Sequence, residues 1–227
     1  MDVQALPHAL LLDCLGTLVR LEPPAPRLRE ALRARAGVEV TEREAQAAMR
    51  AEIAFYREHL DTAVDRAALA ALRRRCAEVV RDVLPALAPV PLETTLAALL
   101  DALVFTPYDD VVPALGALRA RGLRLVVVSN WDVSLHEVLA RTGLDVLLDG
   151  AVASAEVGAA KPDPAPVRRG LELAGVDAGD AWLVGDTPEA DVDGARAAGV
   201  RPVLVDRDGA TAVEGVWTVR SLAELVP

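Results

Sequence analysis

Two aspartates and a pair of small polar residues come directly after, or close to, short apolar runs. Asp13 follows the run Ala9–Leu12, Ser129-Asn130 follow Leu123–Val128, and Gly185-Asp186 follow Ala181–Val184. Runs of this length and composition predict buried strands. In an open parallel sheet, ligands bind at the carboxyl ends of the strands, so these residues are expected in one crevice. Carboxylates there can attack an electrophile or bind a hard cation such as Mg²⁺.

Two further charged residues belong with this group. Asp191 follows Asp186 by five residues, at the start of an expected helix over 189–198. Lys161 is the only lysine among the 24 basic residues, so all the others are arginine. An ammonium is a compact point charge, whereas a guanidinium is a broad planar fork. A sequence that uses arginine elsewhere is expected to keep lysine where the compact charge is required.

Strand and helix patterns alternate after Pro107, which predicts a Rossmann-like parallel sheet covered by helices on both faces. Between the first strand and this region, residues 23–104 show helical periodicity, with a capping-box pattern at Thr41 and Glu44. We therefore expect an α/β core formed by residues 1–20 and 106–227. An all-helical cap is expected over residues 21–105.

The composition limits the function classes. Apolar residues make up 52% of the 227, enough for an aliphatic core, and the net charge of −10 argues against nucleic acid as a partner. No apolar run is long enough to cross a bilayer, and the first eight residues lack the features of a signal peptide. With two cysteines and no disulfide framework, a reducing cytoplasm is the expected location.

The ordered motifs carry a family resemblance. Asp13-Cys14-Leu15-Gly16-Thr17, Ser129-Asn130, Lys161-Pro162 and Gly185-Asp186-Thr187-Pro188-Glu189-Ala190-Asp191 resemble the four motifs of the haloacid dehalogenase-like (HAD) hydrolase superfamily. The resemblance covers the whole chain, including the helical insertion between the first and second motifs. It implies a phosphatase-type hydrolase that acts on a small phosphorylated metabolite, as a monomer or a homodimer.

The resemblance also implies a metal site. Asp13 would be the nucleophile that forms an aspartyl-phosphate. Mg²⁺ would be held by the Asp13 carboxylate, the backbone carbonyl of Leu15 and Asp186. Asp191 would hold waters of the metal or Lys161.

Substrate contacts are implied for four residues. Lys161 would bridge the nucleophile and the phosphate as a catalytic and binding residue. Ser129 would bind phosphate oxygens, and Asn130 and Thr17 are expected to contact the substrate.

Leu15 departs from the phosphatase pattern, which normally has a second aspartate at this position to protonate the leaving group. Its loss predicts a weak phosphatase, or one limited to good leaving groups, because general acid–base help is worth about 10²–10⁴ in rate. A metal-independent 2-haloacid dehalogenase and a catalytically degenerate binding protein remain as alternatives. A cysteine-dependent phosphatase, suggested by the spacing of Cys14 and Arg20, is disfavoured because Pro23 and Pro24 follow where that loop would need a helix.

Overall fold

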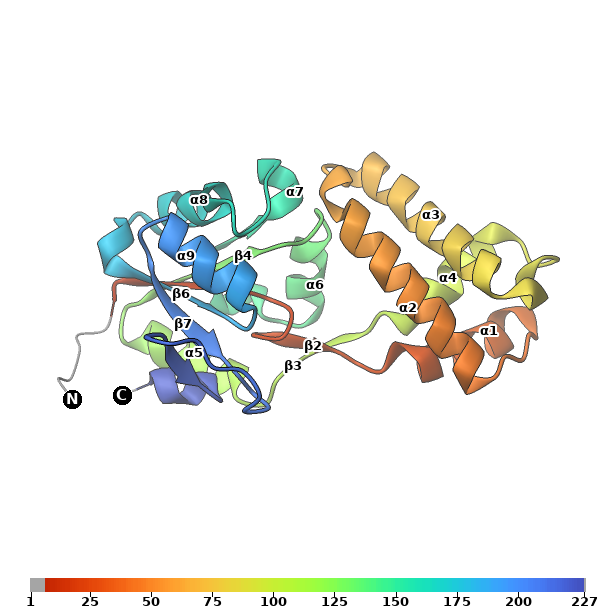
Figure 1. Ribbon diagram of the computed structural model, residues 1–227, viewed down its shortest axis with the longest axis horizontal. Coiled ribbons are helices and arrows are strands. Elements are labelled where there is room, and N and C mark those ends of the chain that lie inside the picture. Colours follow the sequence, from red (N-terminus) through yellow and green to blue (C-terminus); the bar gives the residue numbers. More distant parts are fainter. Residues whose placement is uncertain (1–6, 227) are drawn as a thin grey trace. The chain divides into compact units, whose positions relative to one another are not determined.

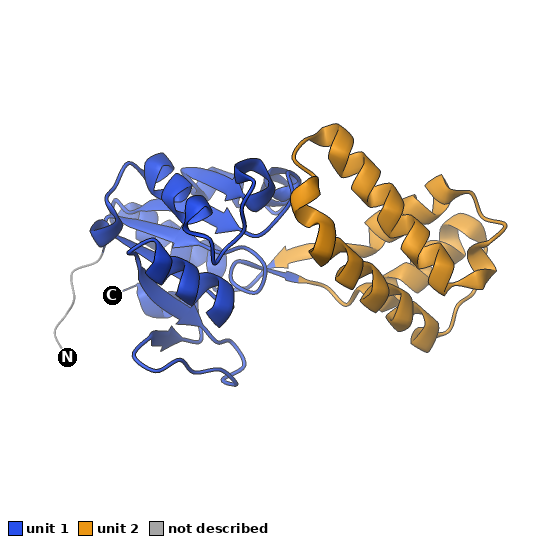
Figure 2. Ribbon diagram, turned by 45° about the horizontal axis from the view of Figure 1, so that its top comes forward, with its two compact units in different colours: residues 1–20, 107–227 blue, residues 21–106 orange. Residues whose placement is uncertain are grey.

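The chain forms two compact units, which Figure 2 distinguishes by colour. The computed structural model describes residues 7–226. One unit takes in the described parts of Met1–Arg20 and Pro107–Pro227, and the other is Leu21–Thr106. Most of the N-terminal segment on which the expectation about a signal peptide rests lies outside the described residues.

The first unit is built on a six-stranded sheet whose neighbouring strands are all parallel (Figure 1). In spatial order the strands are β5 (Gly150–Ala153), β4 (Arg124–Ser129), β1 (Ala9–Leu12), β6 (Ala181–Gly185), β7 (Arg201–Val205) and β8 (Trp217–Val219). The chain adds strands on one side of β1 and then crosses to the other side with β6. This reversal beside β1 is where open α/β sheets bind ligands. The predicted Rossmann-like fold is confirmed.

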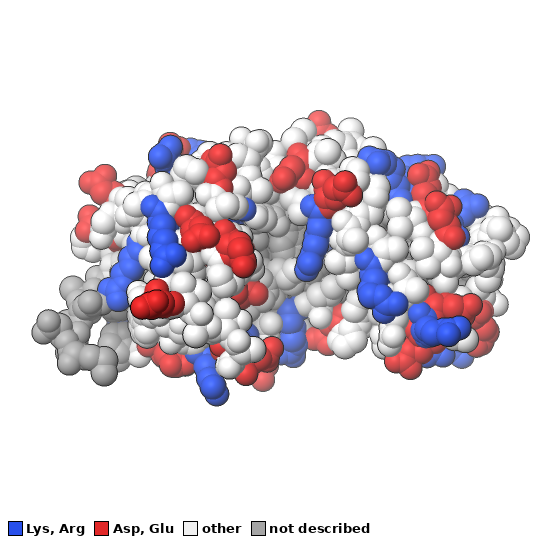
Figure 3. All heavy atoms as spheres, viewed as in Figure 1, with Lys and Arg blue, Asp and Glu red and all other residues white. Residues whose placement is uncertain are grey.

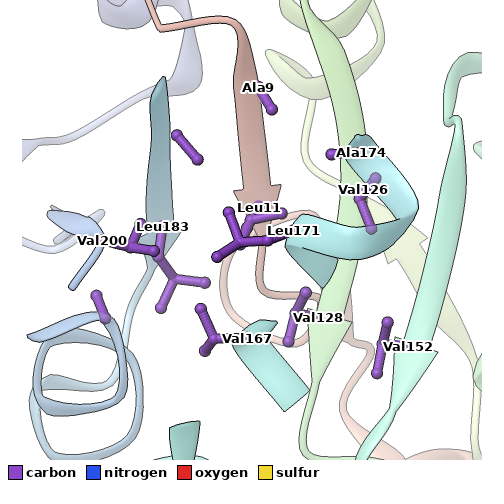
Figure 4. Packing of buried hydrophobic residues seen from close by; sticks show 12 residues of the cluster. Ala9, Leu11, Val126, Val128, Val152, Val167, Leu171, Ala174, Leu183 and Val200 are labelled. Atoms are coloured by element: carbon purple, nitrogen blue, oxygen red, sulfur yellow. The ribbon is translucent and has the colours of Figure 1, made fainter. Parts of the chain in front are cut away.

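Helices cover the sheet because its strands are apolar on both faces. The helices of this unit are α5 (Val111–Ala120), α6 (Leu135–Arg141), α7 (Ser154–Val157), α8 (Pro164–Ala174) and α9 (Asp193–Ala197). Figure 4 shows Leu171 of α8 beside Leu11 of β1, with Val128 and Val167 in the same buried cluster. Leu10 and Leu12 alternate with Leu11 and are equally buried. A strand buried on both faces explains the continuous apolar runs in the sequence.

The segment after β6 differs from the sequence-based expectation. A single helix was expected over 189–198, whereas the structure has a π-helical turn over Pro188–Val192 followed by the short α9. Asp191 lies in the π turn and is buried, with its carboxylate directed back to the amide of Thr187. Wide turns of this kind are often found at functional sites.

The second unit is helical, as the periodicity of the sequence predicted. It contains α1 (Pro24–Ala36), α2 (Glu42–His59), α3 (Arg66–Val83) and α4 (Leu92–Ala102). The predicted capping box opens α2, because the Thr41 hydroxyl accepts from the Glu44 amide and Glu44 accepts from the Thr41 amide. Asp65 caps α3 by accepting a hydrogen bond from the Ala68 amide.

Two strands, not predicted, carry the chain between the units. They are β2 (Val19–Leu21) and β3 (Phe105–Pro107), and they pair in a separate two-stranded sheet. Each has only three residues, too few to show an alternating pattern in the sequence.

The surface carries charged side chains of both signs. On the face shown in Figure 3, acidic and basic side chains are interspersed over both units. Among the described helices, none is both long enough and apolar enough to span a bilayer.

Candidate active site

Three strand ends bring the candidate residues together. Asp13 directly follows β1, Ser129 is the last residue of β4, and Asp186 directly follows β6. The strands are in register, because Leu12 pairs with Val127 on one side and with Val184 on the other. The carboxyl ends of the three strands therefore lie at one level at the same edge of the sheet.

The Asp13 carboxylate is held through one of its two oxygens. The Ser129 hydroxyl donates to Asp13 Oδ1 at 3.0 Å, and Lys161 Nζ donates to the same oxygen at 2.9 Å. The Asp13 amide donates to the Val184 carbonyl at 2.9 Å, which fixes the backbone. Among the described residues, no hydrogen bond is made to Oδ2. One oxygen therefore orients the carboxylate while the other remains available to a ligand.

Lys161 uses all three of its ammonium donors. Besides Asp13, it bonds Asp191 Oδ1 at 2.6 Å and the Val128 carbonyl at 2.7 Å. Its side chain is 1% exposed. Burial by itself would lower the pKa of Lys161, but the charges of Asp13 and Asp191 outweigh burial and raise it. The group is therefore a permanent buried cation, and its geometry suits a compact ammonium.

The side chain of Asn130 holds the backbone of Lys161. Its Nδ2 donates to the Lys161 carbonyl at 2.8 Å, and its Oδ1 accepts from the Lys161 amide at 2.7 Å. This reciprocal pair uses both polar ends of the amide, so Asn130 orients the lysine. Its predicted contact with the substrate stays a prediction.

The loop after Asp13 contains two further predicted residues. Thr17 is completely buried, and its hydroxyl has no hydrogen-bond partner within residues 7–226. A ligand would reach that hydroxyl only if the loop moved. The Leu15 side chain, by contrast, is exposed, and it carries no carboxylate.

The carboxylates of Asp13, Asp186 and Asp191 form a cluster. Each has an oxygen within 4.8 Å of the other two. Burial raises the pKa of Asp186 to about 7, and the nearby charges of Asp13 and Asp191 add to this rise. Burial also raises the pKa of Asp13, while the Lys161 ammonium opposes that change. Three carboxylates face one ammonium, which leaves an excess of negative charge.

Two glycines allow the carboxylates to come this close. A Cβ on Gly16 would overlap the side chain of Asp186, and a Cβ on Gly185 would overlap that of Asp191. Gly16 also has a φ of 88°, in the region that favours glycine. The backbone thus leaves no room for side chains where the acidic residues approach.

The residues present suit a divalent cation. Oxygen ligands at this spacing are those that Mg²⁺ prefers. The orientations of Asp191 and Asp13 are set by Lys161, whereas Asp186 has no cationic partner among the described side chains. A cation beside Asp186 would favour its ionised form and so oppose the rise in pKa that burial and the charges of Asp13 and Asp191 cause.

Cys14 does not suit a nucleophile. The thiol is fully buried, and burial together with the charge of Asp13 raises its pKa well above the ordinary value. A thiolate, which is the reactive form, is therefore disfavoured. This agrees with the sequence argument against a cysteine-dependent phosphatase.

Arg207 contacts the loop after Asp13, but it was not among the residues predicted from the sequence. Its guanidinium donates to the backbone carbonyls of Gly16 and Thr17. Nothing in the sequence distinguished it from the many other arginines. A conserved position in an alignment would be one signal able to single it out.

The parallel sheet, the helical insertion and the acidic cluster together define a class of enzyme. The family model for haloacid dehalogenase-like hydrolases matches residues 7–199, and the chain belongs to this family. The chain is 43% identical over 101 residues to the phosphoserine phosphatase of Thermus thermophilus, a match covering 44% of this chain and 41% of that protein. It is 40% identical over 129 residues to phosphatase MT3486 of Mycobacterium tuberculosis, covering 56% and 58%. These matches thus span about half the length of the curated relatives.

A solved structure resembles the chain over nearly its full length. It is a 2-haloacid dehalogenase from Pseudomonas syringae pv. Tomato DC3000, with a TM-score of 0.66 and 25% identity. The match covers 97% of this chain and 96% of that one. The chain is thus similar to proteins named for two different reactions.

Proposed function

We propose that this protein is a Mg²⁺-dependent phosphatase that hydrolyses a small phosphorylated metabolite. The observation that carries the proposal is the cluster of Asp13, Asp186 and Asp191, in which three carboxylates face the single ammonium of Lys161. Attack of a carboxylate on carbon with loss of halide needs no metal, and an uncompensated buried charge is costly. The phosphatase names of the two curated relatives agree with this reading.

Asp13 is the nucleophile in this proposal. Its free Oδ2 attacks phosphorus while Ser129 and Lys161 hold Oδ1, and the bond from phosphorus to the leaving oxygen breaks. Water then attacks the phosphorus of the aspartyl-phosphate, which releases inorganic phosphate and regenerates the Asp13 carboxylate. Lys161 keeps a positive charge beside the Asp13 carboxylate throughout.

Asp13, Asp186 and the Leu15 carbonyl would hold the metal, with Asp191 acting through water or through Lys161. When bound, Mg²⁺ supplies positive charge that offsets the repulsion between the carboxylate and the phosphate. Asp191 keeps Lys161 in place, since it accepts from Nζ and from the Thr187 amide through its two oxygens.

Leu15 sets the expected substrate range. A side chain without a proton cannot assist departure of an alkoxide, so alkyl phosphates are expected to react slowly. Acyl and aryl phosphates, whose leaving groups need no proton, are expected to react faster.

The second candidate is a metal-independent 2-haloacid dehalogenase. The absence of an acid at position 15 and the likeness to the Pseudomonas syringae enzyme favour it. In that reaction the Asp13 carboxylate attacks carbon and halide leaves. A degenerate member that only binds a phosphorylated ligand or a partner is the third.

One screen distinguishes the three candidate functions. Phosphorylated metabolites and 2-haloacids are incubated with the protein, with Mg²⁺ or with EDTA, and release of phosphate and of halide is measured. Phosphate release that requires Mg²⁺ supports the proposal. Halide release that persists in EDTA supports the dehalogenase, and a lack of turnover with retained ligand binding supports the degenerate member.

Substrate choice is assigned to the helical unit, acting as a cap over residues 21–105. A cytoplasmic location and a monomeric or homodimeric state complete the proposal. The first is tested by fractionation of the cells of origin and the second by light scattering of the purified protein.

A further inference from the structure

Arg207, in the loop after β7, makes four contacts with its guanidinium. Nε donates to the Gly16 carbonyl at 3.2 Å, Nη2 to the Thr17 carbonyl at 2.7 Å and Nη1 to Asp110 Oδ1 at 3.0 Å. The guanidinium carbon also lies 3.7 Å from the centre of the Tyr108 ring. The side chain is 16% exposed, so these contacts are largely shielded from water. Charge-assisted bonds of this kind are stronger than neutral ones.

The two carbonyls belong to the loop that positions the acidic cluster. Gly16 passes so close to Asp186 that no Cβ fits between them. The same loop begins at Asp13 and contains the Leu15 carbonyl assigned to the metal. A displacement of Gly16 would therefore change the distance between Asp13 and Asp186.

Asp110 anchors the guanidinium from the other side. Its Oδ2 accepts from the Ser221 hydroxyl at 2.8 Å and from the Leu222 amide at 2.7 Å. Burial would raise the pKa of Asp110, but these hydrogen bonds and the charge of Arg207 together hold it below its ordinary value. The carboxylate is thus a fixed partner in the ionised form. Arg207 connects a rigid anchor to a loop of the active site.

The residues that Arg207 contacts lie next to the two segments that connect the units along the chain. Thr17 lies just before β2, which leads into the helical unit, and Tyr108 and Asp110 come just after β3, which leads out of it. The planar fork of arginine can donate in several directions at once, whereas the donors of lysine radiate from one atom.

We propose that Arg207 is a positioning residue that holds the Asp13–Thr17 loop in the geometry required for reaction. Its contacts are to Gly16, Thr17, Asp110 and Tyr108, so its role is to act through the loop. The inference rests on the proposed hydrolase function for its kinetic part, and its structural part can be measured independently.

The test compares Arg207→Met and Arg207→Lys with the full-length wild type. Arg124→Met is the matched control, because Arg124 also pairs with an aspartate, Asp149, but stands at the amino end of β4. Three quantities are measured: hydrogen exchange of peptides covering residues 14–20, the Mg²⁺ dissociation constant by calorimetry, and kcat and KM for the best substrate.

In Arg207→Met, exchange in residues 14–20 is expected to accelerate by about tenfold or more, with β6 unchanged. Mg²⁺ binding should weaken, and kcat should fall about 10–100-fold with little change in KM, since misplacement of about 1 Å can cost this much. Arg207→Lys should recover overall stability but not kcat. Arg124→Met should match the wild type in all three.

The inference is overturned if Arg207→Met and Arg124→Met show the same hydrogen exchange in the loop and the same Mg²⁺ affinity. It is also overturned by an Arg207→Lys variant with wild-type exchange and kcat. If Arg207→Met does not fold, Arg207→Lys is judged by the same measures. If the wild type turns over no substrate, the proposed function fails, and loop exchange alone decides whether Arg207 holds the loop.

Discussion

The Lys161 ammonium lies 2.6 Å from Asp191 Oδ1, and both side chains are almost completely buried. A buried ion pair is seldom a large source of net stability, but removal of one partner leaves an uncompensated charge. Asp191 also accepts from the Thr187 amide, so its carboxylate bonds both the lysine and the backbone just after β6. The pair therefore ties the motif at residue 161 to the motif at 185–191.

Lys161→Met should lower the free energy of unfolding by about 3–5 kcal/mol near neutral pH, because Asp13 and Asp191 then lose their buried cation. Urea denaturation measures the change, and turnover should be lost. Arg124→Met, which breaks a pair on the surface, should cost about 1 kcal/mol or less. Equal costs for the two variants would contradict the role given to Lys161.

Asp13→Asn should abolish turnover while the protein stays folded, because the amide cannot attack as the carboxylate does. Cys14→Ser should keep most of the activity, since the thiol is buried and protonated. Steady-state kinetics and circular dichroism measure the two properties. The reverse pattern would return Cys14 to consideration as the nucleophile.

Leu15→Asp should supply the missing acid. Turnover of an alkyl phosphate is expected to rise by up to about 10²–10⁴, and that of an activated aryl phosphate by much less. The Leu15 side chain is exposed, so the new carboxylate should cost little in folding. A variant that folds and binds Mg²⁺ but gains nothing on alkyl phosphates would favour the dehalogenase or the degenerate member.

Gly16→Ala should have two effects: a loss of stability from the left-handed backbone conformation and a loss of Mg²⁺ affinity from the contact of the new Cβ with Asp186. Gly122 has a φ of 84°, close to the 88° of Gly16, but a Cβ there would meet no atom within 4 Å. Both alanine variants should lose about 1–2 kcal/mol of stability from the left-handed conformation. Only Gly16→Ala should also weaken Mg²⁺ binding, because its Cβ would displace Asp186. Equal Mg²⁺ affinities by calorimetry would disprove this reading.

Glu52, buried in the helical unit, should make stability depend on pH. Burial raises its pKa from 4.5 to about 7, and a hydrogen bond with Cys76 opposes the rise only in part. The folded state therefore binds the proton more tightly than the unfolded state. Its contribution to the free energy of unfolding is greatest below pH 4.5 and is lost as the pH rises to about 7.

The size of this loss is on the order of 3 kcal/mol. Glu52→Gln should remove it, so that the variant gains stability relative to the wild type as the pH rises from 5 to 8. Glu58→Gln, an exposed position of the same helix, should follow the wild type. Denaturation curves across this pH range measure the difference, and parallel curves for all three proteins would contradict the assignment.

Local signals in the sequence predicted several elements closely. The ends of helix α8 are marked in the sequence, because Pro164 favours the first turn and Gly175 ends the helix in the left-handed conformation. Helix α2 begins where the Thr41 and Glu44 capping box placed it. By contrast, β2 and β3 are too short to show a period, and the segment at 188–192, expected as the start of a regular helix, forms a π turn.

The sequence by itself determined the family and the motif residues, because aspartates at the ends of apolar runs and a single lysine are local features that can be recognised in the sequence. The tertiary structure alone decided which atoms meet: Asn130 bonds the backbone of Lys161, and Arg207 reaches the carbonyl of a residue 191 positions away. Such contacts depend on how distant segments pack, and neither periodicity nor spacing encodes that packing. The physical reason is that local conformational preferences act over a few residues, whereas burial and electrostatic pairing act between segments joined only by the fold.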